Sequence, residues 1–213
     1  MEPRLMTALQ TTTRKAPRET DAVPLAIEAD PRWAAVMARK PDRTPGAATL
    51  VRFAAGKCSL GSILVARSEK GICAILLGDR AESLERDLRR RFPQAPLAGR
   101  DADTEALLAK VARVVENPHL AVDFPLDMRG TTFQRRVWQM LRTIPAGSTA
   151  SYAEVARRIG APRSVRAVAQ ACGANALAVA VPCHRVVRSD GTPSGYRWGA
   201  DRKRALLERE ARR

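Results

Sequence analysis

Aromatic residues, cysteines and long apolar runs are all scarce in this sequence, and each shortage narrows the class of protein. Aromatic residues make up only 4% of the 213 residues, so aliphatic side chains must form most of the core. The 45% apolar content is enough for one large domain or two small ones. No apolar run reaches the ~18 residues that a membrane-spanning helix needs, and the N-terminal "MEPRLMTALQTTTRKAPRET" lacks the apolar segment of a signal peptide. We therefore expect a cytoplasmic protein with no membrane partner.

Metal ligands and cofactor motifs are equally few. The sequence has four cysteines without a C-x-x-C pair and only two histidines, His119 and His184. A structural zinc site would need four nitrogen or sulfur ligands at closer spacings. The glycine patterns of dinucleotide-binding and phosphate-binding loops are missing as well. We predict neither a metal nor a cofactor.

Positive charge is abundant and unevenly distributed. Residues 1–125 carry 20 Lys and Arg against 16 Asp and Glu, whereas residues 126–213 carry 17 against 6. A net charge of +15 that is concentrated in the C-terminal half favours a polyanion as the partner of that half. A domain that is simply rich in arginine is the alternative at this point.

The sequence up to residue 125 divides into a polar segment and a small α+β domain. Residues 1–45 show little periodicity, apart from a short candidate helix at 31–40, and are predicted to be flexible. Three β-prone runs between 49 and 78, separated by "GKCSLG" and "SEKG", predict an antiparallel three-stranded meander. Apolar positions at helical spacing then predict two helices, at 79–92 and 101–117. We place this domain at 46–125.

Residues 126–213 are predicted to form a mostly helical domain. Thr131 followed by Gln134, and Ser151 followed by Glu154, are capping-box patterns that open two helices. The second of these helices, the turn "GAPR" and a third helix over "VRAVAQACGA", with Ser164 as its cap, match a helix-turn-helix. A plain helical hairpin is the alternative interpretation.

The third helix of this domain has one face of unusually small residues. Val165, Val168 and Cys172 are expected to face the core, which turns Arg166 and Gln170 outward among alanine and glycine. An ordinary helix is ~10–12 Å across, whereas the DNA minor groove is only ~6 Å wide. A face with small residues and one arginine therefore suits a minor groove that is being widened.

The stretch "AVAVPCHRVV" (178–187) carries the candidate nucleophile. Residues 176–181 are predicted to form a short buried strand or extended run that Pro182 ends. Cys183 then lies beside His184, Arg185 and Arg188, and cationic neighbours lower the pKa of a thiol from its free value of ~8.5. The residues alone leave a reactive thiol and a half-buried structural thiol equally open.

This stretch and its surroundings resemble a known family. "PCHRVV", with "SGYRWG" after it and "SYAEVARRIGAPRSVRAVAQACGANALA" before it, resembles the O6-alkylguanine-DNA alkyltransferases, which are methylated-DNA–protein-cysteine methyltransferases. From "CSLGSILVARSEKGICAILLGD" to "KRALLERE", over roughly residues 48–211, the chain is similar to the C-terminal domain of bacterial Ada proteins. The resemblance implies an α+β fold, in which a ribonuclease H-like domain precedes a winged-helix-like domain that contains the helix-turn-helix.

The resemblance also implies a function. Members of the family flip an O6-alkylated guanine out of the duplex and transfer its alkyl group irreversibly to their own cysteine, here Cys183. A soft thiolate suits displacement at a saturated carbon, and the thioether product has no good leaving group, which implies a single turnover. The implied partner is double-stranded DNA that contains O6-alkylguanine, with O4-alkylthymine as a further candidate. The protein is expected to act as a monomer.

The functional residues of the family match individual positions of this sequence. His184 and Glu210 match the pair that activates the thiol through a water, and Tyr152 matches the tyrosine that donates a proton toward the departing guanine. Asn175 matches the asparagine that bridges the helix-turn-helix and the active-site segment, and Arg166 matches the arginine finger that fills the gap left by the flipped base. The remaining implied positions are Ser151, Arg135, Ala167 and Gln170 for DNA binding, and Pro182, Val186, Tyr196, Arg197 and Trp198 for the substrate pocket.

The sequence departs from full-length Ada at its N-terminus. The zinc domain of Ada is built on four cysteines that this sequence lacks, yet "ADPRWAAVMARKPDR" (29–43) resembles the opening helix of that domain. We interpret residues 1–45 as the remnant of a lost regulatory module.

Two other functions compete with alkyl transfer. A DNA-binding regulator without catalysis is one, although relatives of that kind lack the cysteine. A cysteine hydrolase is the other, and it would need a distant oriented histidine, for which only His119 is available.

Overall fold

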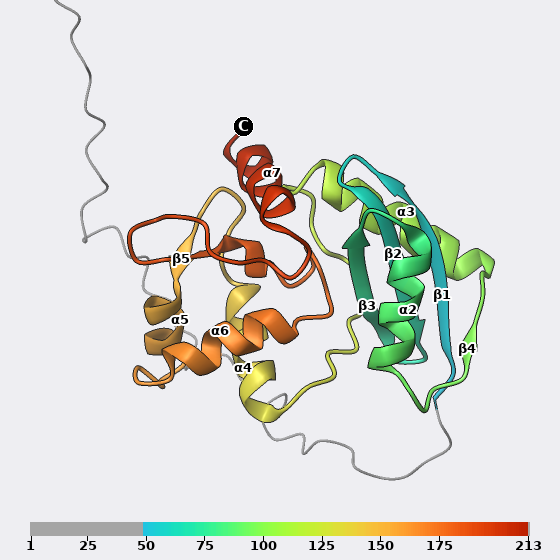
Figure 1. Ribbon diagram of the computed structural model, residues 1–213, viewed down its shortest axis with the longest axis horizontal. Coiled ribbons are helices and arrows are strands. Elements are labelled where there is room, and N and C mark those ends of the chain that lie inside the picture. The colour runs from blue at the N-terminus through green and yellow to red at the C-terminus, as the bar shows by residue number, and fades with distance from the viewer. Residues whose placement is uncertain (1–48, 213) are drawn as a thin grey trace, which may run out of the picture. The chain divides into compact units, whose positions relative to one another are not determined.

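The structure of the protein is a computed structural model, in which residues 49–212 are described (Figure 1). The predictions for residues 1–45 therefore lie outside the described residues. Within 49–212 a small sheet with two helices precedes a mainly helical part, which confirms the predicted α+β fold class. None of the helices in this range combines the length and the apolar character that spanning a membrane requires.

The sheet consists of three consecutive antiparallel strands and one short parallel strand. β1 (Val51–Cys58), β2 (Gly61–Ser68) and β3 (Gly71–Gly78) form the predicted meander. β4 (Leu97–Ala98) adds to β1, so the strand order is β3-β2-β1-β4. The sequence did not predict β4, because two residues are too short to show an alternating pattern.

Two helices cover opposite faces of this sheet. α2 (Ala81–Arg91) and α3 (Ala102–Glu116) confirm the two predicted helices of this domain. Successive strand residues point to opposite faces. Accordingly, Leu64 of β2 belongs to the apolar cluster that contains the buried side of α2, and Ile63 belongs to the cluster that contains α3. The interior of this domain is therefore fixed by aliphatic packing on both sides of the sheet.

The C-terminal part contains the three helices that the sequence predicts around the helix-turn-helix. α4 (Thr132–Leu141) opens with the predicted capping box, in which Thr131 Oγ1 accepts from the Gln134 N–H and the Gln134 side chain accepts from the Thr131 N–H. α5 (Tyr152–Arg158) and α6 (Val165–Ala174) follow and pack against each other and against α4.

Two local predictions for α6 are wrong. Ser164 makes no side-chain cap to the described residues, and its backbone carbonyl instead accepts from the Val168 N–H at 2.9 Å. The periodicity predicts a buried Val165, yet this side chain is 36% exposed. The buried side chains of α6 are Val168, Ala171 and Cys172, so the helix faces the core with its later turns and not with its first residue.

The C-terminal part docks on the free edge of β3. Ile75 of β3 forms a parallel bridge with Leu177, with backbone hydrogen bonds of 2.8 and 3.0 Å. The surrounding segment 176–181 is mostly buried, as predicted, but this bridge is its only strand-like pairing within residues 49–212. Val179 turns the chain with a φ of 58°, which ends any extended run. The docking places this segment in the apolar core that both parts share.

Short elements and one helix complete the chain. β5 (Ala150–Ser151) pairs in parallel with β6 (Val186–Val187). A 3-10 helix of one turn, η1 (Cys183–Arg185), lies directly before β6. The last helix, α7 (Ala200–Ala211), packs against η1. Its buried side chains are Lys203, Leu206 and Glu210.

Candidate active site around Cys183

Cys183 opens the turn η1, directly after the buried Pro182, and is only 4% exposed. It is thus more deeply buried than the half-buried structural thiol that was one of the two alternatives left open by the sequence. A 3-10 turn has three residues per turn, so successive side chains point in different directions. The Cys183 side chain bonds Asn175, whereas that of His184 bonds Glu210. In the described part of the chain the two groups make no direct hydrogen bond.

Asn175 lies between the helix-turn-helix and the candidate nucleophile, where the family resemblance places it. It ends α6, and its Nδ2 donates to the Val181 carbonyl at 2.8 Å and lies 3.2 Å from Cys183 Sγ. Its Oδ1 accepts from the Leu177 N–H at 2.9 Å, and the side chain is fully buried. A donor that is fixed against sulfur favours the thiolate over the thiol.

His184 and Glu210 form a buried pair between η1 and α7. His184 Nε2 lies 2.7 Å from Glu210 Oε1, and Arg185 Nε lies 3.0 Å from both carboxylate oxygens. Burial alone would raise the pKa of Glu210, but hydrogen bonds from His184 and Arg185 lower it to about 2. Burial lowers the pKa of His184, which Glu210 partly counteracts. At neutral pH the site therefore holds a neutral imidazole, and its Nδ1 has no partner within residues 49–212.

The pKa of Cys183 corrects the expectation from the sequence. Burial raises it to about 11, although the Asn175 hydrogen bond and the Lys203 charge lower it. The sequence placed arginines beside the thiol, but Arg188 is exposed and Arg185 is engaged by the carboxylate of Glu210. Little thiolate exists in the free protein at neutral pH, so nucleophilic chemistry at this sulfur would need a base that removes the thiol proton.

A buried lysine that the sequence analysis missed completes the site. Lys203 is fully buried, and its Nζ donates to the Val186 carbonyl at 2.6 Å and to Ser194 Oγ at 3.1 Å. Burial lowers its pKa, while negative charge on the Cys183 sulfur would raise it. The signal was present in the sequence: Lys203, Leu206 and Glu210 have the spacing of one helix face, so two charged residues share the apolar side of α7.

Three aromatic residues that the family resemblance assigns to the site lie close to one another or to its polar groups. Tyr152 Oη lies 2.6 Å from Ser194 Oγ, and burial raises its pKa. The Tyr196 ring packs edge-on against His184, at 6.3 Å between ring centroids, and against Trp198 at 5.1 Å. Tyr196 Oη and Trp198 Nε1 are buried and lack a partner in the described range. Buried polar groups rarely stay unpaired, so a ligand with hydrogen-bond acceptors would complement them.

The structure brings the predicted DNA-contacting residues together only in part. Arg166 and Gln170 are exposed on α6, and the half-buried Ala167 lies between them in sequence. Ser151, by contrast, caps the first turn of α5, and Arg135 donates to a backbone carbonyl before α4 at 2.7 Å. Both of these side chains therefore have structural partners in the free protein.

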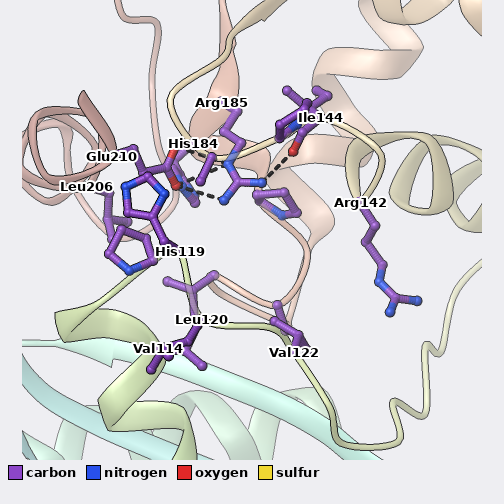
Figure 2. Close-up of a pocket in the computed structure, with 16 residues that line it drawn as sticks. Val114, His119, Leu120, Val122, Arg142, Ile144, His184, Arg185, Leu206 and Glu210 are labelled. Atoms are coloured by element: carbon purple, nitrogen blue, oxygen red, sulfur yellow. Dashed lines mark hydrogen bonds and ion pairs between the residues drawn. The ribbon is translucent and has the colours of Figure 1, made fainter. Parts of the chain in front are cut away.

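A cavity of about 310 Å³ lies beside the His184–Glu210 pair (Figure 2). Figure 2 shows His119 and Leu120 on one wall and the buried pair with Arg185 on another. Within residues 49–212 the His119 ring makes no hydrogen bond to Cys183, so the oriented triad that a hydrolase would need is not formed. The same range contains no group of three His, Cys, Asp or Glu side chains placed to hold a metal ion.

The fold and the site together define a class of protein, in which a small sheet domain precedes a helix-turn-helix domain with one buried cysteine beside an imidazole–carboxylate pair. The family model described as "6-O-methylguanine DNA methyltransferase, ribonuclease-like domain" matches residues 51–116. The model described as "6-O-methylguanine DNA methyltransferase, DNA binding domain" matches residues 132–212. The two matches cover the two parts of the structure in the same order.

Individual relatives agree with these matches. The bifunctional transcriptional activator/DNA repair enzyme Ada of Escherichia coli is 51% identical over 175 residues, which are 82% of this chain and 49% of that protein. The inducible methylated-DNA–protein-cysteine methyltransferase of Bacillus subtilis is 40% identical over 58% of this chain and 69% of its own length. The crystal structure of Mycobacterium tuberculosis OGT in complex with DNA matches with a TM-score of 0.63 and 33% identity, over 76% of this chain and 92% of that one.

The chain belongs to the 6-O-methylguanine DNA methyltransferase family. It spans about half the length of the Ada proteins that it matches.

Proposed function

We propose that this protein repairs O6-alkylguanine in duplex DNA by transferring the alkyl group to its own Cys183, irreversibly and in a single turnover. O4-alkylthymine is a second candidate substrate of the same chemistry. The observation that carries the proposal is the arrangement around Cys183. Asn175 contacts the buried sulfur at 3.2 Å, the neutral His184 follows in the same turn, and the ionised Glu210 faces His184 from the adjoining helix α7.

The buried charges support a proton transfer from the thiol to the imidazole. A water between Cys183 and the unpaired Nδ1 of His184 would carry the proton, and Glu210 would stabilise the resulting imidazolium. The Asn175 amide and the Lys203 ammonium would stabilise the thiolate at the other end of the transfer. The site is thus arranged to stabilise a thiolate–imidazolium ion pair, although the thiol is protonated in the free protein.

The group transfer itself is a displacement at a saturated carbon. A lone pair of the thiolate forms the S–C bond, while the bond between carbon and O6 breaks and its electrons remain on guanine. A proton that Tyr152 donates, and that the imidazolium can replace, then neutralises the departing base. Cys183 is 4% exposed, so the alkyl carbon reaches Sγ only after neighbouring side chains move.

The helix-turn-helix supports recognition of duplex DNA. The exposed face of α6 carries Arg166 and Gln170 among small residues, which suits close approach to a minor groove. Arg166 would occupy the position of the flipped base, and removing the base from the stack would cost about a few kcal/mol. We also propose that the protein acts as a monomer in the cytoplasm, on the DNA of the nucleoid.

The test is intact mass spectrometry after incubation of the full chain with duplex DNA that contains O6-methylguanine. One methyl group should appear on each protein molecule, and peptide mapping should place it on Cys183. Cys183→Ala should accept no methyl group while its affinity for DNA stays nearly unchanged. An unmodified wild-type chain that still binds DNA would favour the non-catalytic regulator instead, and repeated turnover of an ester or peptide would favour the hydrolase.

A further inference from the structure

We propose that Asp87 on α2 is a positioning residue for alkyl transfer, which acts through Arg197 on the segment Tyr196–Trp198, here called the pocket segment. The N-terminal domain would then take part in the reaction by holding one wall of the acceptor site. This inference rests on the proposed function.

Arg197 connects three elements that are distant in the sequence. Its Nη2 lies 3.3 Å from both carboxylate oxygens of Asp87 on α2, and its Nη1 donates to the Gly173 carbonyl in the last turn of α6 at 3.3 Å. One planar guanidinium thus ties the pocket segment to the N-terminal domain and to the second helix of the helix-turn-helix. Displacing it would loosen the segment from both.

A second arginine holds the far end of the pocket segment against the same domain. Arg202 Nη1 donates to the Trp198 carbonyl at 2.8 Å, and its Nε donates to the Leu60 carbonyl, in the turn between β1 and β2, at 2.8 Å. Its remaining Nη2 bonds Asp79 after β3. The pocket segment is therefore fixed from both sides by contacts that cross to the sheet domain.

The held segment presents the aromatic groups that surround the site. Tyr196 packs edge-on against His184 and Trp198, and both aromatic residues carry buried donors without partners in residues 49–212. A shift of this segment would displace Tyr196 from the imidazole that receives the thiol proton. Misplacement of reacting groups by ~1 Å can slow a reaction by up to about 100-fold, so a modest displacement has a measurable effect.

The surroundings of Asp87 make this ion pair stronger than an ordinary surface contact. The Asp87 side chain is 19% exposed and that of Arg197 is 32% exposed, so water screens the pair only in part. Burial would raise the pKa of Asp87, but Arg91 and Arg197 lower it, which keeps the carboxylate ionised at neutral pH. The apolar contacts of α2 are made by Leu84 and Leu88, and the carboxylate also bonds the largely buried Arg91 at 3.4 Å on the same helix.

The test compares single-turnover methyl transfer in four variants of the full chain. Asp87→Asn should lower the rate constant about tenfold, both for duplex DNA and for the free base O6-methylguanine. Its DNA affinity should stay within about twofold, because the exposed face of α6 is unchanged. Asp87→Glu, which keeps the carboxylate, should recover most of the rate. Arg197→Gln, which also removes the contact with Gly173, should be slower than Asp87→Asn, and the double variant should be no slower than Arg197→Gln alone.

Arg90→Gln is the matched control, because Arg90 contacts Asp87 at 3.5 Å but its side chain is 70% exposed and leaves the bridge to the pocket segment intact. It should transfer at the wild-type rate. A wild-type rate in Asp87→Asn, a faster rate, or losses that add in the double variant would overturn the positioning role. A wild-type chain that accepts no methyl group would instead overturn the proposed function itself.

Discussion

The interiors of the two parts of the chain differ in kind. In residues 49–125 the buried polar side chains are Ser62, Ser68 and Thr104, all of them uncharged. In residues 126–212 the buried set also includes charged or titratable groups, His184, Lys203 and Glu210. Burying a charge costs free energy unless it is paired, and replacement of such groups by apolar residues is often neutral or stabilising. The C-terminal part therefore carries groups that its stability alone does not require.

The buried charges of the C-terminal part are arranged around the candidate nucleophile. The two charges of α7 sit at its two ends with opposite signs, Lys203 near the acceptor sulfur and Glu210 near His184. Such a pair favours the state in which the sulfur is negative and the imidazole positive, because each charge faces its opposite. The described residues of the sheet domain include no buried pair of opposite charges of this kind, and the role proposed for this domain is to hold the pocket segment in place.

The largest effect is expected when the proton acceptor is removed. His184→Gln should lower the rate of methyl transfer at neutral pH by about 10²–10⁴-fold. The wild-type rate should fall only at pH values below 6.5, because the pKa of His184 is lowered and a protonated imidazole accepts no proton. The rate of the variant should rise with pH toward about 11, because only thiolate that forms without the imidazole can react.

Single-turnover rates from pH 5 to 9 measure both profiles, with His119→Gln as the control. The His119 ring is exposed and lines the same cavity without bonding the pair, so its loss should leave the profile unchanged. Parallel pH profiles in the wild type and in His184→Gln would show that His184 does not receive the proton.

A second prediction concerns the contribution of the buried Glu210 carboxylate to the free energy of unfolding. Glu210→Gln should lower the free energy of unfolding by about 3–5 kcal/mol, because it leaves the Arg185 guanidinium without its counter-charge in a largely buried position. The folded-state pKa of Glu210 is about 2 against 4.5 for the ordinary carboxyl group. A lowered acid pKa gives stability that is present above 4.5 and is lost as the pH falls toward 2. The difference between wild type and variant should therefore shrink over that interval.

Urea denaturation at pH 7 and at pH 3 measures this difference. Glu116→Gln is the matched control, since Glu116 bonds Ser59 and Arg209 but its side chain is 48% exposed. It should cost only about 0–1 kcal/mol. Equal losses in the two variants would mean that burial adds nothing to the Glu210 network.

Sequence patterns were sufficient for the fold wherever one period extends over several turns or strands. The meander, the two helices of the sheet domain and the capping box at Thr131 all follow from local spacing. β4 and the bridge at Leu177 do not, because their pairing partners come from distant parts of the chain and involve only one or two residues. The exposure of Val165 is likewise decided by what packs on α6 rather than by the helix itself.

The site was predictable as a set of residues but not as an electrostatic arrangement. Cys183, His184, Asn175 and Glu210 could be named from the resemblance, and the structure does bring them together. The pKa of the thiol could not be predicted. Its cationic neighbours in the sequence suggested a lowered pKa, whereas burial, which depends on the tertiary fold, raises it. Lys203 was missed although its spacing from Glu210 on α7 marks it as buried.

The smallest predicted effect concerns the aliphatic core of the sheet domain. Ile63 in β2 is fully buried among aliphatic residues, so Ile63→Val should lower the free energy of unfolding by about 0.5–1.5 kcal/mol through the lost methylene group. The substitution leaves the Asp87–Arg197 and Arg202–Leu60 contacts in place, and the rate of methyl transfer should not change. Urea denaturation and single-turnover transfer on the same preparation test both statements. A slower transfer in this variant would mean that the packing of the sheet, and not only its contacts to the pocket segment, reaches the acceptor site.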